Sequence, residues 1–140
     1  MLKIDSIINH YEAAKLKSLK SIKELLEYFA VKVYLTFALV VNIFTWLFAR
    51  YIYTNIGQDK MALHYSVDFG IDLYGGRGGI FVIPVLGFLF LLFNIFLLVI
   101  ITVYNKRDSH FLSHLILSTV MIANTALLLA IFTVYLINFR

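Results

Sequence analysis

Three long runs of apolar residues dominate the hydrophobic pattern of the chain. Val33 to Ala49, Ile80 to Tyr104 and Leu115 to Asn138 contain no charged residue. A helix needs about 20 apolar residues to cross a hydrocarbon core about 30 Å thick, and every backbone amide in lipid needs an internal partner. We therefore expect three transmembrane helices, over about 33–53, 80–104 and 115–138.

A different periodicity precedes the first run. Apolar residues recur every three or four positions between residues 2 and 29, with lysines on the opposite side, which is typical of an amphipathic helix. We expect residues 1–32 to form a cytoplasmic helix and residues 33–140 to form the membrane domain. The helix could lie on an anionic membrane surface, pack on its own membrane domain, or pack on a second copy. No glycine or proline separates it from the first span, so one continuous bent helix is an alternative.

The loop over 54–79 has the period of a strand. Apolar and polar residues alternate strictly from Leu63 to Leu73, which indicates an extended segment with one apolar face. Such a segment must fold back on its own loop, dock on helix ends, or pair with another chain. The glycine-rich stretch Tyr74 to Gly79 predicts a flexible turn, and Pro84 falls in the first turns of the second span, where its missing N–H is tolerated. The short second loop makes the last two spans an antiparallel hairpin, with Ser109 as a helix cap.

Composition agrees with this organisation. The chain is 61% hydrophobic and 14% charged, against roughly a quarter charged in soluble domains. The expected fold class is an all-α membrane protein with an N-terminal amphipathic helix, three transmembrane helices and one ordered extended loop. Most of the 12 basic residues lie before the first span or in the second loop, which favours a cytoplasmic N-terminus and an external C-terminus and loop 54–79. The lipid bilayer is the expected partner, and nucleic acid is not.

Each predicted span contains one asparagine near its middle: Asn42, Asn94 and Asn124. A side-chain amide in lipid seeks a partner on a neighbouring helix, at about 0.6 to 2 kcal/mol for each bond. We expect an intramembrane polar layer that holds the three helices together. A polar pathway for an ion or small solute is the alternative, although such pathways usually contain an acid or base within the membrane.

No metal site or cofactor is expected. His110 and His114 are spaced i, i+4, but they lack the glutamate of the H-E-x-x-H zinc signature, and helix capping or headgroup contact is the simpler interpretation. The chain has no cysteine, which removes thiolate ligands and thiol nucleophiles. Gly75 to Gly79 lack the G-K-[ST] of a phosphate loop.

The loop residues His64, Asp68 and Asp72 would lie along one side of an extended strand. The spacing of next-but-one positions is too wide for one metal ion unless the segment folds over. A His–Asp pair could instead fix the loop or contact a partner. We expect a contact loop that consists of His64, Tyr65, Asp68, Asp72 and Gly75. A membrane enzyme that uses His64 and Asp72 is the less favoured alternative.

This loop resembles a motif of small bacterial multi-pass membrane proteins related to the Sdp-type bacteriocin immunity family. In that motif a histidine and an aromatic residue lead through a glycine and an aspartate to a second glycine, before a proline-containing transmembrane helix. His64, Tyr65, Asp72, Gly75 and Pro84 match it, over about 25 of the 140 residues. The proline that normally precedes the histidine is missing, and glycines replace the final lysine or serine pair. The resemblance implies a bacterial cytoplasmic membrane and an exposed loop, and it implies no reaction.

These patterns together predict a small, non-enzymatic integral membrane protein. It would act through contacts with other membrane proteins or with itself, as an accessory, immunity-like or assembly subunit. The alternative is a transporter or channel subunit that oligomerises around the asparagine layer.

Overall fold

Four α-helices and one short β-hairpin make up the fold. The computed structural model describes residues 2–57, 59–66, 68–104 and 109–139, and it describes the side chains of all of these except 2–6, 10, 65 and 109. The elements follow in the order α1 (Leu2–Glu27), α2 (Phe29–Asn55), β1 (Lys60–Ser66), β2 (Gly70–Gly76), the 3₁₀ helix η1 (Arg77–Phe81), α3 (Val82–Tyr104) and α4 (Ser109–Asn138). The predicted fold class, an N-terminal helix followed by three apolar helices with an ordered loop, is confirmed.

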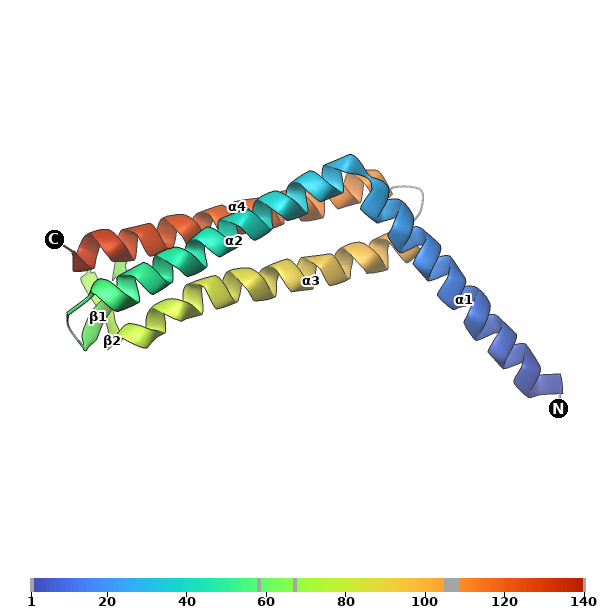
Figure 1. Ribbon diagram of the computed structural model, residues 1–140, viewed down its shortest axis with the longest axis horizontal. Helices are drawn as coiled ribbons and strands as arrows, with labels where there is room; N and C mark the ends of the chain where they lie inside the picture. Colours follow the sequence, from blue (N-terminus) through green and yellow to red (C-terminus); the bar gives the residue numbers. More distant parts are fainter. Residues whose placement is uncertain (1, 58, 67, 105–108, 140) are drawn as a thin grey trace.

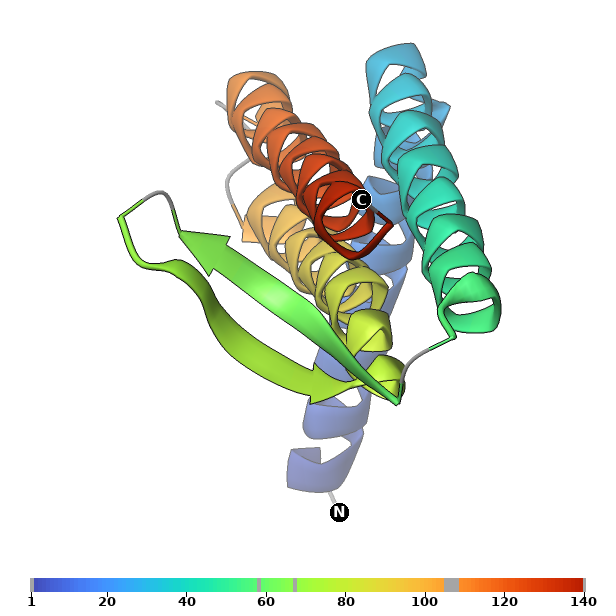
Figure 2. The same cartoon turned by 90° about the vertical axis from the view of Figure 1, so that its left-hand side faces the viewer.

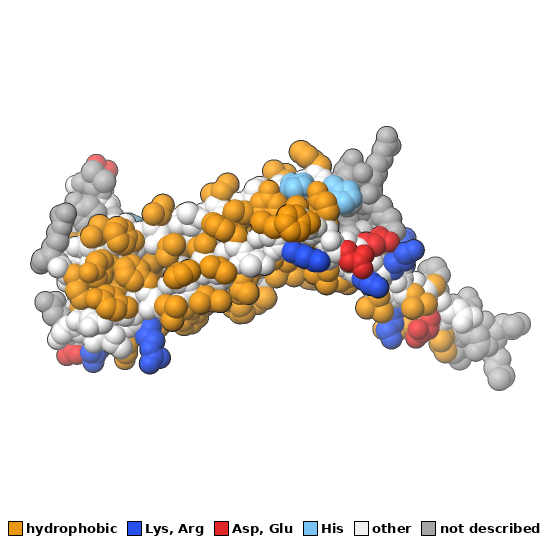
Figure 3. Space-filling view, turned by 45° about the horizontal axis from the view of Figure 1, so that its top comes forward, with side chains coloured by type: hydrophobic (Ala, Val, Ile, Leu, Met, Phe, Trp, Pro, Cys, Tyr) orange, Lys and Arg blue, Asp and Glu red, His pale blue; other side chains and the backbone are white. Residues whose placement is uncertain are grey.

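Helices α2, α3 and α4 lie side by side in one bundle (Figure 1). Each is long and apolar enough to cross a membrane. Only 28%, 28% and 22% of the residues in their most apolar segments are buried inside the chain, so most apolar side chains face outward. Figure 3 shows these side chains covering the bundle, with charged groups at its ends and along α1. Water does not solvate an apolar surface of this size, so the chain is a multi-pass membrane protein.

Helices α2 and α4 are longer than the apolar runs that predicted them. α2 begins at Phe29 and includes Lys32, and α4 begins at Ser109, ahead of the predicted start at 115. A charged or polar residue ends an apolar run, but it does not end a helix, because a long side chain at the membrane edge extends its charge toward water. The second span is shorter than its apolar run, because residues 77–81 form η1 and α3 begins only at Val82.

A break at Tyr28 separates α1 from α2, which answers the question left open by the sequence. The backbone of Tyr28 is extended (φ −68°, ψ 115°), and its N–H donates to the carbonyl of Leu25 at 3.1 Å. α1 therefore leaves the bundle at an angle, and the N-terminus lies far from the C-terminus (Figure 1).

Only the last turns of α1 pack on the bundle. Leu25 is buried with Val31, Leu98 and Leu117. Apolar side chains nearer the start of α1, on the face that the sequence predicted, remain largely exposed, at 65% for Ile7 and 67% for Tyr11. The predicted amphipathic helix is present, but its apolar stripe has no partner over most of its length in the described part of the chain.

The hairpin closes the opposite end of the bundle. It crosses the ends of α3 and α4, and its turn projects past them (Figure 2). A buried cluster holds it there, formed by residues of α2 and its C-cap, β1, η1 and α4: Ala49, Ile52, Ile56, Met61, Ile80, Ile131 and Val134. Met61 is only 1% exposed, so β1 belongs to the core of the bundle.

Candidate functional site

The predicted contact loop folds back on itself. β1 and β2 pair antiparallel, from Lys60 opposite Gly76 to Ser66 opposite Gly70. Gly70 has φ +73°, which favours glycine, and the backbone N–H of Phe69 donates to Ser66 Oγ at 3.1 Å. The segment is thus extended on both sides of the turn and folds back on its own loop, which is one of the three arrangements that its pattern allowed.

A bulge at Leu63 explains two glycines, one at the end of β2 and one in η1. The register of the two strands shifts on either side of His64, and such a shift redirects side chains. The side chain of Leu63 lies over Gly75 and Gly79, where an added Cβ would overlap with Leu63 Cδ1. The expected flexible turn at 74–79 is therefore wrong: its first half completes β2, its second half forms η1, and two of its glycines make room for Leu63.

The hairpin brings together two of the three polar residues proposed for a site. His64 Nδ1 lies 2.6 Å from Asp72 Oδ1, and the two side chains are 63% and 39% exposed. Asp68 lies exposed in the turn, outside this pair, and the side chain of Tyr65 lies outside the described residues. The pair arises because the strand folds over, which the period of two alone could not show.

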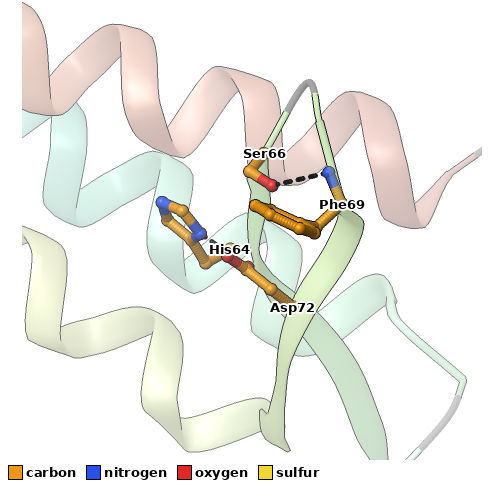
Figure 4. A network of polar contacts seen from close by, with 4 residues as sticks. All are labelled: His64, Ser66, Phe69 and Asp72. Carbon is orange, nitrogen blue, oxygen red and sulfur yellow. Dashed lines mark hydrogen bonds and ion pairs between the residues drawn. The ribbon is translucent and has the colours of Figure 1, made fainter.

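The pair fixes one ring nitrogen of His64 and leaves the other available. A carboxylate only accepts, so Nδ1 donates and Nε2 remains for a ligand, as an acceptor in the neutral ring and as a donor in the charged ring. In Figure 4 this second nitrogen points away from Asp72. Among the described residues no hydroxyl group is hydrogen-bonded to it, and the chain has no cysteine. The arrangement supplies an oriented imidazole for binding or proton transfer, without an adjacent nucleophile.

Asn138 attaches the hairpin to α4, and the sequence analysis did not identify it. Its Oδ1 accepts from the backbone N–H of Ala62 at 2.9 Å, and its Nδ2 donates to the carbonyl of Ala62 at 2.8 Å. The side chain thus pairs with the outer edge of β1 as a neighbouring strand would. A polar amide at the end of an otherwise apolar run was the available signal.

Arg77 lies beside the hairpin and contacts protein groups. Its guanidinium lies 3.9 Å from Asp59 Oδ1 and 5.5 Å from the ring centre of Tyr53, and its backbone N–H donates to the carbonyl of Asp59. Exposure of both charged groups keeps the ion pair weak. These contacts orient the start of η1 toward the end of α2.

Two of the three mid-span asparagines meet inside the bundle. Asn42 Nδ2 donates to Asn124 Oδ1 at 3.3 Å and to the carbonyl of Pro84 at 3.1 Å. Gly87 lies against both amides, and an added Cβ would be 2.6 Å from Asn42 Nδ2 and 2.9 Å from Asn124 Oδ1. The three helices therefore share one polar contact, built from two asparagines, a proline carbonyl and a glycine that permits close approach.

Asn94 does not belong to this polar contact. It lies seven residues beyond Gly87 on α3, about 10 Å along the axis, and its amide donates to Phe90 of its own helix at 2.8 Å. The expectation of one layer with three asparagines is thus wrong for Asn94. α3 contributes Pro84 and Gly87 instead, because its backbone approaches the other helices near its start.

A histidine–tyrosine cluster lies where α1 joins the bundle. His114 Nε2 is 2.9 Å from Tyr28 Oη, and Nδ1 is 3.4 Å from Tyr34 Oη. His110 packs edge-on against Tyr28, with ring centres 4.7 Å apart. The sequence indicated the two histidines but not the tyrosines, which are far from them along the chain. The cluster holds the break at Tyr28 against α4.

No group of three or more histidine, aspartate or glutamate side chains within the described ranges could hold a metal ion. His110 and His114 instead contact the aromatic rings of Tyr28, at the break between α1 and α2, and of Tyr34 in α2. Comparison of the chain with family models, with curated proteins and with solved structures gave no match. The geometry of the chain's own residues is therefore the basis for a functional proposal.

Proposed function

We propose that this small multi-pass membrane protein acts without catalysis, through a contact between its hairpin and a partner membrane protein. Its role would be that of an accessory, immunity-like or assembly subunit. The resemblance of the segment from His64 to Pro84 to the Sdp-type immunity family supports this class of role. The same resemblance supports a bacterial cytoplasmic membrane, and the charge distribution supports an orientation with the N-terminus inside and the hairpin outside.

The observation that carries the proposal is the exposed surface of β2 and the adjoining turn. Their apolar side chains are exposed to solvent, with exposed fractions of 86% for Phe69, 52% for Leu73 and 62% for Tyr74. These residues lie outside the three helices that cross the membrane. Exposed aromatic and aliphatic side chains on a fixed scaffold are typical of contact surfaces.

The backbone of the hairpin supports the same proposal. The sheet has two strands, and Asn138 covers the outer edge of β1 at Ala62. Among the described residues no hydrogen bond outside the sheet reaches β2. An open strand edge beside apolar side chains can accept an extended segment of a partner.

The burial of the asparagines weighs against the alternative of a pore between copies. Asn42, Asn94 and Asn124 are 3%, 4% and 1% exposed within a single chain. A channel that oligomerised around these amides would need them on the surface of the bundle. Their hydrogen bonds are consistent with a role in helix packing.

Cysteine labelling tests the proposal, because the chain has no native cysteine. We would compare Asp68→Cys, at the exposed turn, with Gly57→Cys, an exposed loop position at the same end of the bundle. A docked partner should protect position 68, but not position 57, from a membrane-impermeant maleimide in native membranes. Purified protein in detergent or in lipid vesicles should label at both positions.

Two results would contradict the proposal. Equal labelling of both positions in native membranes would mean that the hairpin is unoccupied. Protection of position 68 that persists in vesicles of purified protein would mean that lipid or a second copy covers the turn. Labelling of position 57 in intact compared with permeabilised cells reports the orientation in the same experiment.

A further inference from the structure

A groove lies beneath the hairpin, along the outer surface of α3 and α4. Its volume is about 350 Å³, which is within the range of small-molecule sites. Residues of β1, α3 and α4 line it: Leu63, His64, Ile83, Ala130, Thr133, Val134 and Ile137. Figure 2 shows the hairpin projecting past these two helices, so it overhangs their sides at this end.

The lining is apolar along the helices and polar at the hairpin. Between Ala130 and Ile137 the α4 wall rises by about 10 Å, and its one polar side chain, Thr133, donates its hydroxyl to Leu129 of the same helix at 3.0 Å. His64 lines the groove from β1. His64 Nδ1 is hydrogen-bonded to Asp72 Oδ1 at 2.6 Å, which leaves Nε2 available to bind a ligand.

A groove with apolar walls and a polar end fits an amphiphile, a molecule with an apolar chain and a polar head. The walls are the end turns of helices that cross the membrane, where acyl chains are the surrounding solvent. An apolar chain in the groove would lie parallel to α4, and its polar head would lie at the level of the hairpin. Because Asp72 accepts from Nδ1–H, the charged ring of His64 can donate its Nε2–H to a phosphate oxygen.

We propose that this groove binds one phospholipid, with an acyl chain between α3 and α4 and the phosphate at His64. The site goes beyond the contact role of the hairpin, because it uses the inner side of β1 and leaves the open edge of β2 free. It also gives the pair of His64 and Asp72 a role that the proposed partner contact does not require.

The experiment is native mass spectrometry of the purified full chain in mild detergent, titrated with phosphatidylglycerol. We expect one lipid that is retained above the background of further adducts. Ala130→Phe should fill the groove and lower binding at least tenfold. Thr125→Phe is the control, because it places the same side chain on an exposed position of α4 outside the groove, about 140° around the helix axis from Ala130.

A second pair of variants tests the head group. His64→Leu, which removes the donor, should weaken binding about threefold to tenfold, the size expected for one hydrogen bond. His110→Leu, at an exposed histidine at the other end of the bundle, should leave binding unchanged. All four positions face outward at least in part, and helical content by circular dichroism verifies that each variant folds.

Three results would overturn the proposal. Equal lipid retention by Ala130→Phe and Thr125→Phe would mean that the lipids only surround the bundle. Unchanged binding by His64→Leu would remove the phosphate contact from the site. Retention of a second copy in place of lipid, lost in Ala130→Phe, would make the groove an interface between chains.

Discussion

Adding one methyl group at Gly87, by the variant Gly87→Ala, tests how the three spans pack. A Cβ at this position would be 2.6 Å from Asn42 Nδ2, 2.9 Å from Asn124 Oδ1 and 3.2 Å from Leu127 Cδ1. The nearest two atoms belong to the amides that hydrogen-bond each other. Gly87→Ala therefore forces at least one amide to move, and the bonds from Asn42 to Asn124 and to Pro84 must lengthen.

The expected loss of stability follows from these two bonds. An interhelical hydrogen bond in a membrane protein contributes about 0.6 to 1.7 kcal/mol, so two give about 1 to 3 kcal/mol. Alanine restores up to about 1 kcal/mol through its better helix propensity. We expect Gly87→Ala to lower the free energy of unfolding by about 1 to 2 kcal/mol.

The measurement is unfolding in mixed micelles with a rising fraction of SDS, followed by circular dichroism. Gly78→Ala is the control, because an added Cβ there meets nothing within 4 Å, and it should change stability by less than about 0.5 kcal/mol. In an Asn42→Ala background the effect of Gly87→Ala should shrink, because the closest atom and both bonds are already gone. Stability equal to or above that of the wild type would refute the described contact.

Two further predictions concern the hairpin. Asn138→Leu should make local opening of β1 easier by about 1 to 3 kcal/mol, the contribution of two hydrogen bonds, and this appears as faster amide exchange in β1. Asn55→Leu is the control, because the Asn55 amide bonds its own helix, and it should leave that exchange unchanged. Equal exchange in both variants would contradict the role of Asn138 in attaching β1. Gly79→Ala should destabilise the hairpin by about 0.5 to 1.5 kcal/mol, because the end of the Leu63 side chain must leave its rotamer to avoid the added Cβ; proteolysis at the turn measures this loss. Gly76→Ala should not destabilise the hairpin, and Leu63→Ala should rescue Gly79→Ala if the overlap is the cause.

The sequence predicts the helices well because lipid permits few alternatives. Uncharged runs of this length must be helical in a membrane, and the helices α2, α3 and α4 include nearly all of the three runs. The break at Tyr28 could not be predicted, since neither glycine nor proline marks it. Contacts of Tyr28 with His110 and His114, far away along the chain, hold it in place.

The candidate site was predictable in its residues but not in its geometry. Alternation identified His64 and Asp72 as polar positions of an extended segment, and their contact depends on a turn that alternation does not reveal. The prediction of a layer of three asparagines was wrong for Asn94, and the reason is different. Position along each run suggested a common depth, whereas the actual contact with α3 uses a backbone carbonyl and the missing side chain of Gly87.

The bond between Asn138 and Ala62 also sets an order of assembly. The two residues are 76 positions apart, so β1 leaves the ribosome well before its edge partner exists. The hairpin can reach its final position only after α4 has been inserted beside the earlier spans. Until then, the strand edge that later pairs with Asn138 is open to chaperones, proteases or a neighbouring chain during biosynthesis.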